Sequence, residues 1–160
     1  MASKLRQSIA DYLAGHHVMT LATQGTDGPW AAAVFYANAG NHLVFLSSPT
    51  SRHCRNLLQD SRCCATIHEN YDDWRQIKGI QLEGQVIEPQ GQEQKHAQGL
   101  YGQKFPNVSR LADAPPALVS AIARVRWYVL HPKRIYFIDN SQGLGHREQI
   151  DLSEETDLNR

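Results

Sequence analysis

Cysteine is scarce in this 160-residue sequence, which contains three cysteines, Cys54, Cys63 and Cys64. The number is odd, and Cys63 and Cys64 are adjacent, so a framework of disulfide bonds is not expected. The sequence also lacks the C-x-x-C and H-E-x-x-H patterns that are typical of metal sites. We therefore predict reduced thiols, as in cytoplasmic proteins, and no metal site.

The sequence also lacks an excess of charge and long apolar runs. It contains 16 Lys and Arg residues and 16 Asp and Glu residues, whereas a surface that binds duplex nucleic acid needs a dense basic stripe. No stretch is long and apolar enough for a membrane span, and the N-terminus lacks the apolar core of a signal peptide. We therefore expect a cytoplasmic protein that binds neither nucleic acid nor a membrane.

The length and the apolar pattern predict one mainly β domain over residues 1–150 and an acidic, flexible tail over residues 151–160. A first helix is expected from its cap at Ser3 to Gly15, and a weaker one over residues 90–104. Short strands joined by tight turns favour an antiparallel barrel over an alternating βαβ sheet. The expected strands cover residues 17–24, 30–38, 42–46, 62–69, 77–87, 125–130 and 134–138.

Residues 44–58 organise the rest of the chain and are predicted to form a strand, a turn and a helix. Residues 44–46 are β-formers, and Pro49 ends the strand because it keeps Ser48 out of the α region. Ser48 is then a candidate N-cap with Pro49 as the first helical residue, and Thr50 is the alternative cap. The expected buried face of the helix consists of Cys54, Leu57 and Leu58.

The start of this helix gathers groups that bind phosphate. A helix N-terminus has free N–H groups and a partial positive charge. Arg52 adds a planar guanidinium and His53 a possible second cation. Hydroxyl donors come from the turn, at Ser47, Ser48, Thr50 and Ser51. Together these groups predict a pocket for a phosphate monoester, although an ordinary capped helix with solvated arginines fits the same residues.

The predicted strand 30–38 carries three consecutive small residues, Ala31, Ala32 and Ala33. Small side chains leave room for a flat group to lie on the strand backbone. Close packing against a neighbouring strand explains them equally well, so the residues alone leave both interpretations open.

Several motifs together resemble the flavin-binding split-barrel superfamily that includes pyridoxamine 5′-phosphate oxidase. The run Leu46-Ser47-Ser48-Pro49-Thr50-Ser51-Arg52-His53 follows a strand over residues 30–36, as in that superfamily. Three later runs are similar to its poorly characterised YhbP-like branch: Lys78-Gly-Ile-Gln-Leu-Glu-Gly84, Tyr101-x-x-x-Phe105-Pro106 and Tyr136-Phe-Ile-Asp139-Asn140-x-x-Gly143-x-Gly145. The resemblance implies a six-stranded antiparallel split barrel and a homodimer with FMN sites at its interface.

The resemblance also assigns residues to the flavin phosphate. Ser51 and Arg52 match a Ser-Arg-Lys sequence that holds the phosphate in the oxidase, and His53 replaces its Lys. Ser47 matches a hydroxyl position that faces the phosphate. Because His titrates and is shorter than Lys, the resemblance implies weaker or pH-dependent phosphate binding here.

A second flavin-binding segment of the oxidase corresponds to residues 31–36. There the strand begins with a phosphate-binding Arg and ends with a Lys, whereas this chain has Ala31 and Tyr36. Two positive contacts are therefore missing. The backbone contacts still expected with the flavin ring are those of Ala32, Ala33 and Val34.

The partner subunit is expected to contribute Gln81 and Asn140 to the cofactor site. The leading hypothesis is an FMN-dependent oxidoreductase whose substrate and catalytic residues cannot be identified, because the pyridoxal-binding residues of the oxidase have no match. One alternative is a non-catalytic homodimer that binds flavin or haem, with His16, His17 or His146 as an iron ligand. The other alternative is a deazaflavin-dependent reductase.

Overall fold

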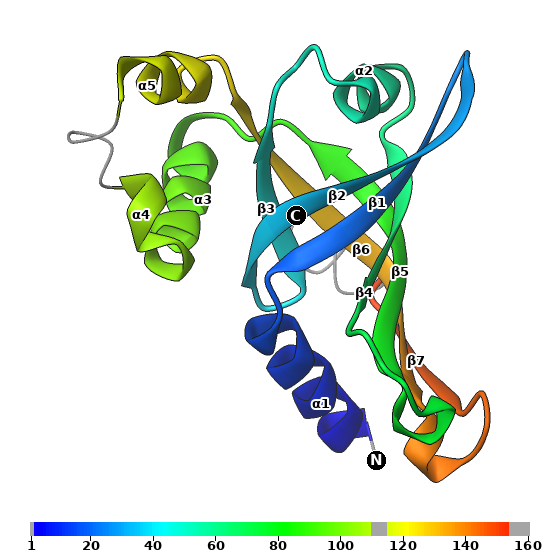
Figure 1. Cartoon of the computed structure of the whole chain (residues 1–160). Helices are drawn as coiled ribbons and strands as arrows, with labels where there is room; N and C mark the ends of the chain where they lie inside the picture. The colour runs from blue at the N-terminus through cyan, green and yellow to red at the C-terminus, as the bar shows by residue number, and fades with distance from the viewer. Residues whose placement is uncertain (1, 110–114, 154–160) are drawn as a thin grey trace.

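A computed structural model describes residues 2–109 and 115–153 and contains one closed β-barrel (Figure 1). Its strands are β1 (Val18–Gly25), β2 (Gly28–Ala39), β3 (His42–Ser47), β4 (Arg62–His68), β5 (Lys78–Ile87), β6 (Arg126–Asp139) and β7 (Arg147–Asp151). They form one antiparallel sheet in the order β3-β2-β1-β4-β5-β6-β7, and pairing between β3 and β6 closes six strands into the barrel. The expected six-stranded split barrel is confirmed.

Helices lie at both ends of the barrel and on one side (Figure 1). Helix α1 (Ala2–Gly15) buries Leu5, Ile9 and Leu13 in the barrel core at one end. Helix α2 (Arg52–Gln59) covers the opposite end. The segment between β5 and β6 contains α3 (Gly91–Lys104), α4 (Pro106–Ser109) and α5 (Pro116–Ile122).

The barrel interior is filled by alternate residues of each strand. In β1, Met19 and Leu21 are buried, whereas Ala22 is on the outer face. Phe45 of β3 stacks on Tyr128 of β6 with 5.2 Å between ring centroids. The largest fully buried side chains are Tyr36, Phe45, Ile9, Leu13, Met19, Leu21, Leu43, Ile67, Ile80, Leu130 and Ile135.

A second, smaller apolar cluster holds α3 against the outside of the barrel. Ala37 of β2, Val44 of β3 and Val129 of β6 pack there with Ala97 and Tyr101 of α3. These strands are therefore buried on both faces at this side, while β1, β4 and β5 keep an open outer face.

One strand replaces the two that were expected near the C-terminus. β6 runs without a break from Arg126 to Asp139, so the predicted interruption at His131 and Pro132 is wrong. The pairing with β5 shifts register between Glu83 and Gly84. Pro132 is tolerated because it lies at this irregularity, where the strand partner is Gly84. A Cβ on Gly84 would lie 2.2 Å from His131 O, so only glycine permits this approach.

The barrel edge includes the first residues of the predicted tail. β7 ends at Asp151, and Leu152 is buried and donates its N–H to Lys133 O at 2.8 Å. Residues 154–160 lie outside the described part of the chain. Within residues 2–109 and 115–153, no helix has the length and apolar character needed to cross a membrane.

Candidate functional site

The N-cap of α2 is Ser51, so the predicted caps Ser48 and Thr50 are wrong. Ser51 is extended, with φ −63° and ψ 151°, and its Oγ accepts a hydrogen bond from Cys54 N at 3.4 Å. The other two residues form the preceding turn: Thr50 N donates to Ser48 Oγ at 3.3 Å, and Ser51 N donates to Ser48 O at 3.0 Å. The Ser48 hydroxyl is therefore used before the helix begins.

The buried face of α2 is more polar than its apolar spacing predicts. His53, Cys54, Asn56 and Leu57 are buried, whereas Leu58 is 89% exposed. The prediction that Leu58 packs in the core is wrong, because the helix turns Asn56 toward the barrel.

Asn56 docks α2 on the hairpin formed by β1 and β2. Its Nδ2 donates to Oγ1 of the buried Thr23 at 3.1 Å. A Cβ on Gly25 would lie 2.1 Å from Asn56 Oδ1, so this close approach requires glycine. The start of α2 is thereby fixed relative to the hairpin.

His53 joins two serine hydroxyls at the start of α2. Its Nε2 lies 2.6 Å from Ser47 Oγ and 3.2 Å from Ser51 Oγ. The imidazole is buried, whereas both serines are half-buried. We call Ser47, Ser51, Arg52 and His53, with the free N–H groups at the start of α2, the anion cradle.

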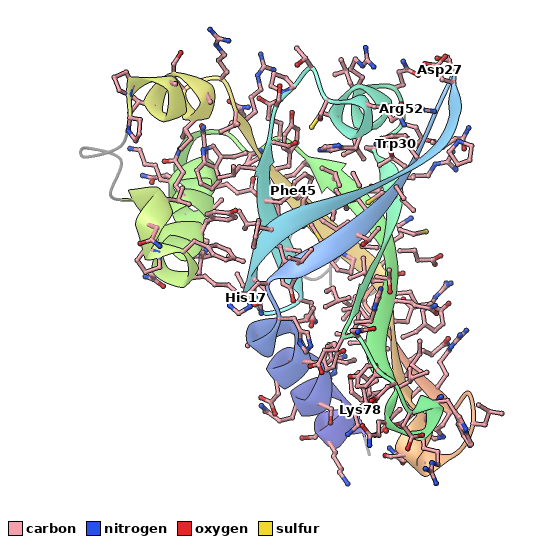
Figure 2. All side chains as sticks on the ribbon, viewed as in Figure 1. His17, Asp27, Trp30, Phe45, Arg52 and Lys78 are labelled. Atoms are coloured by element: carbon pink, nitrogen blue, oxygen red, sulfur yellow. The ribbon has the colours of Figure 1, made fainter. Side chains whose placement is uncertain are left out.

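Arg52 links the anion cradle to the tip of the hairpin. Its Nη2 donates to Asp27 O at 2.8 Å, and its guanidinium carbon lies 4.6 Å from the centroid of the Trp30 ring. Its Nε is buried and has no hydrogen-bond partner within the described residues. Figure 2 shows Asp27, Trp30 and Arg52 together at the end of the barrel that α2 covers. Arg52 therefore keeps one buried donor free at the start of α2.

Cys54 lies directly behind the anion cradle. Burial opposes ionisation of its thiol, but hydrogen bonds with His53, Ser51 and Tyr128 lower the Cys54 pKa below its usual value. Burial and the hydrogen bond with Cys54 raise the pKa of Tyr128. The groups around Cys54 therefore offset the cost of burying its thiolate.

The three expected ring-contact residues lie in the middle of β2 and pair with β1. Ala33 is exposed on the outer face, Ala32 is half-buried, and Val34 is buried in the core. Tyr36, which the resemblance aligns with a Lys of the oxidase, is fully buried and donates its hydroxyl hydrogen to Leu13 O at 2.8 Å. Among these side chains, only Ala33 faces open space.

Gln81 lies on the same outer face as Ala33. Cross-strand pairs connect Ala33 to Thr20, Thr20 to Thr66, and Thr66 to Gln81. Three strand spacings place Gln81 about 14 Å from Ala33 along the sheet. Gln81 lines a hollow of about 330 Å³ with Thr20, Ala22, Cys64, Ala65, Thr66, Leu82, Glu83, Tyr136 and Arg147.

Asn140 begins the short helix η3 (Asn140–Gln142) and builds a turn. Its Nδ2 donates to Trp74 O at 2.8 Å, and its Oδ1 accepts from Gly145 N at 3.0 Å. Its backbone N–H donates to Ile77 O, beside Lys78, which Figure 2 places at the opposite end of the molecule from Arg52. One chain therefore does not bring Asn140 to the anion cradle, and its contribution to a partner's site stays a prediction.

Trp30 and Asp27 were not among the residues singled out from the sequence, although they contact Arg52. The available signal was an isolated Trp between a Gly-Pro turn and a run of alanines. The contact itself depends on the hairpin folding over α2, because the partners are more than twenty positions apart in the sequence.

Comparison with known proteins identifies relatives of the whole chain. A family model described as pyridoxamine 5′-phosphate oxidase matches residues 5–139. A UPF0306 protein of Photorhabdus laumondii subsp. laumondii is 30% identical over 143 residues, which cover 88% of this chain and 92% of that protein. The UPF0306 protein YhbP of Escherichia coli O157:H7 is 26% identical over 142 residues, which cover 88% of each chain. The resemblance to the YhbP-like branch is confirmed.

Solved structures with the same fold bind different cofactors. A haem-binding protein from Mycobacterium smegmatis has a TM-score of 0.70 and 24% identity; the match covers 89% of this chain and 57% of that one. The haem storage protein HutZ from Vibrio cholerae has a TM-score of 0.64 and 14% identity, covering 91% and 92%. An FAD-binding protein from Mesorhizobium loti has a TM-score of 0.63 and 18% identity, covering 81% and 90%. These likenesses show the fold alone.

Proposed function

The chain belongs to the pyridoxamine 5′-phosphate oxidase family, and from this premise we propose that it binds FMN and acts as a flavin-dependent oxidoreductase. The observation that carries the proposal is the free, buried Nε of Arg52 at the start of α2, next in sequence to the His53 that joins the hydroxyls of Ser47 and Ser51. A buried guanidinium donor without a partner costs free energy unless an acceptor joins it. A phosphate oxygen is such an acceptor, and the start of α2 favours its negative charge.

The residues of the anion cradle fit the phosphate end of a flavin nucleotide. In the proposed complex, Ser47 and Ser51 donate their hydroxyl hydrogens, Arg52 donates from Nε, and His53 orients both hydroxyls from the buried side. The isoalloxazine ring of a bound flavin supplies the redox chemistry, whereas the protein binds and orients it. The open outer face at Ala33 supports a position for the ring along β2.

The proposal includes a homodimer in which Gln81 of one protomer contributes to the site of the other. Its support is the open outer face of β1, β4 and β5, where the small residues Ala22 and Thr66 line the hollow beside Gln81. A hollow between small side chains admits the atoms of a second copy or of a flat ligand. Asn140 is retained only as a possible second contribution, since its amide is already bonded within its own turn.

A second candidate function is haem binding, and its support is the free nitrogen of His146. Nε2 of His146 is buried without a hydrogen-bond partner within the described residues, 3.7 Å from Glu148 Oε2. His16 is a weaker candidate, because its ring nitrogens lie 2.7 Å from Tyr12 O and 2.8 Å from Glu69 Oε1. His146→Ala should remove a Soret band if this function is correct.

The first test is the visible absorption spectrum of the purified protein, with mass analysis of any compound released on denaturation. FMN binding predicts a flavin spectrum, or its appearance when FMN is added to colourless protein. Arg52→Ala removes a charge-assisted hydrogen bond of about 1.5–3 kcal/mol and should weaken FMN binding roughly ten- to a hundredfold.

Arg55→Ala is the matched control for this test. Arg55 is exposed on the same helix and lies outside the anion cradle, so its removal tests whether any loss of charge on α2 has the same effect. Equal affinity of wild type and Arg52→Ala for FMN would remove Arg52 from the site. A Soret band in place of a flavin spectrum would favour the haem function.

A further inference from the structure

We propose that the anion cradle accepts a flavin dinucleotide better than FMN, with the adenine ring stacked on Trp30. This inference rests on the proposed flavin function and extends the ligand beyond its first phosphate. It concerns the surface where the hairpin tip meets α2.

The exposure of Trp30 is the first observation. Trp30 shares one face of β2 with Val34 and Tyr36, which are buried in the core, yet the Trp30 ring is 41% exposed. An indole offers a large flat surface on which a nucleotide base stacks irrespective of sequence or base type. The Arg52 guanidinium covers part of this surface at 4.6 Å from the ring centroid. The indole therefore lies beside one residue of the anion cradle.

The charge of the anion cradle is the second observation. Arg52 is the only permanently charged side chain among its four residues, and Ala31 and Tyr36 of β2 add no charge. FMN ends in a phosphate monoester, which carries roughly −1.5 to −2 charges at neutral pH. Each phosphate of a dinucleotide is a diester with a single negative charge. The two neighbouring phosphates together carry about as much charge as the FMN phosphate, so the charge of the anion cradle admits both flavins and the preference for the dinucleotide comes from Trp30.

The position of Arg52 connects the two observations. Its Nη2 bonds to Asp27 O, its plane lies over Trp30, and its Nε is free. The guanidinium can therefore donate to a phosphate from Nε while it stays on the indole. A ligand that continues past this phosphate passes directly over the hairpin tip, where an adenine ring meets Trp30.

The test is calorimetric titration of the flavin-free protein with FMN and with FAD. We expect wild type to bind FAD roughly tenfold more tightly than FMN, as one base–aromatic stack allows. Trp30→Ala should abolish this ratio, whereas Trp30→Phe should keep most of it because an aromatic surface remains. The affinity ratio is used because the loss of the indole also removes the ring that Arg52 packs on, which affects the binding of both flavins. Trp74→Ala is the control, since Trp74 is 54% exposed on the distant helix η1 (Trp74–Gln76).

The outcomes separate this inference from the function on which it rests. Binding of FMN and FAD with equal affinity, or an affinity ratio unchanged in Trp30→Ala, would overturn the dinucleotide and leave the flavin function intact. Failure of the wild type to bind either flavin would overturn both.

Discussion

The resemblance aligns His53 with a lysine of the oxidase, and the contacts of His53 indicate a role that does not depend on a charge. An ammonium carries a full charge, whereas a neutral imidazole can supply an N–H at Nε2 to the serine oxygens, which leaves their hydroxyl hydrogens for the ligand. With Nε2 within 3.2 Å of both serine oxygens, His53 sets the directions in which Ser47 and Ser51 point. His53 therefore orients the two serine hydroxyls that bind the ligand, and this role does not require a charge on the imidazole ring.

This role predicts that the flavin affinity does not fall as pH rises from neutral to mildly alkaline buffer, where the ligand phosphate is already a dianion. His53→Ala should weaken binding by roughly three- to tenfold, because two neutral hydrogen bonds of about 0.5–1.5 kcal/mol each become less well directed. Calorimetry across this pH range, with Arg52→Ala as the comparison, measures both effects. An affinity that falls as pH rises in the wild type but not in His53→Ala would instead identify His53 as a cation.

Among the helices, the ends of α1 and α3 are joined by one amino group. Nζ of Lys104, the last residue of α3, donates to His16 O at 2.5 Å and to Leu13 O at 3.4 Å. It also lies 4.3 Å above the centroid of the Tyr36 ring. A cation at the C-terminus of α1 is favoured by the helix dipole, but burial lowers the pKa of Lys104 to about 8.

The lowered pKa predicts a specific pH dependence of stability. Lys104 has a pKa of about 8 in the folded chain against an ordinary value of 10.5, so between these pH values the unfolded chain binds more protons. The free energy of unfolding contributed by Lys104 therefore rises from pH 8 to pH 10.5 and is lowest below pH 8. As the pH rises through this range, the urea midpoint of wild type should increase relative to that of Lys104→Met. A difference between the two proteins that does not change with pH would contradict the lowered pKa.

The elements that depend only on residues nearby in the sequence were predicted well. The strands around the barrel and the strand–turn–helix at residues 42–59 follow from apolar alternation and from Pro49. The failures depend on tertiary contacts. Leu58 is exposed because Asn56 meets Thr23 and Gly25 on the hairpin.

The site was predictable to the same extent. Ser47, Ser51 and His53 lie within seven positions of one another, and their meeting follows from the turn. The contacts of Arg52 with Asp27 and Trp30 were not predictable, because they require the position of the hairpin tip above α2. The periodicity of apolar residues carries no information about where the hairpin tip lies relative to α2.

For the whole molecule, the open outer face predicts a dimer. The hollow of about 330 Å³ next to Gln81 shares Ala22, Cys64 and Glu83 with a neighbouring hollow of about 530 Å³. Both lie on the side of the barrel opposite to the strands that α3 covers. A stable dimer interface buries about 800 Å² on each partner, and this face is a continuous surface with small side chains at its centre.

Ala22→Arg tests the dimer and the shared cofactor site together. A guanidinium at the centre of the face would fill the hollow and would have to lose its water on association, which opposes dimer formation. We expect the wild type to sediment as a dimer and Ala22→Arg as a monomer with unchanged circular dichroism and weaker flavin binding. Gln103→Arg, at an exposed position of α3, controls for the added charge and should remain dimeric. A dimer that persists in Ala22→Arg would place the interface elsewhere, and a wild-type monomer that holds flavin would show that one barrel forms the complete site. The second result would also end the proposed role of Gln81 across the interface, because a monomer that holds flavin needs no second copy.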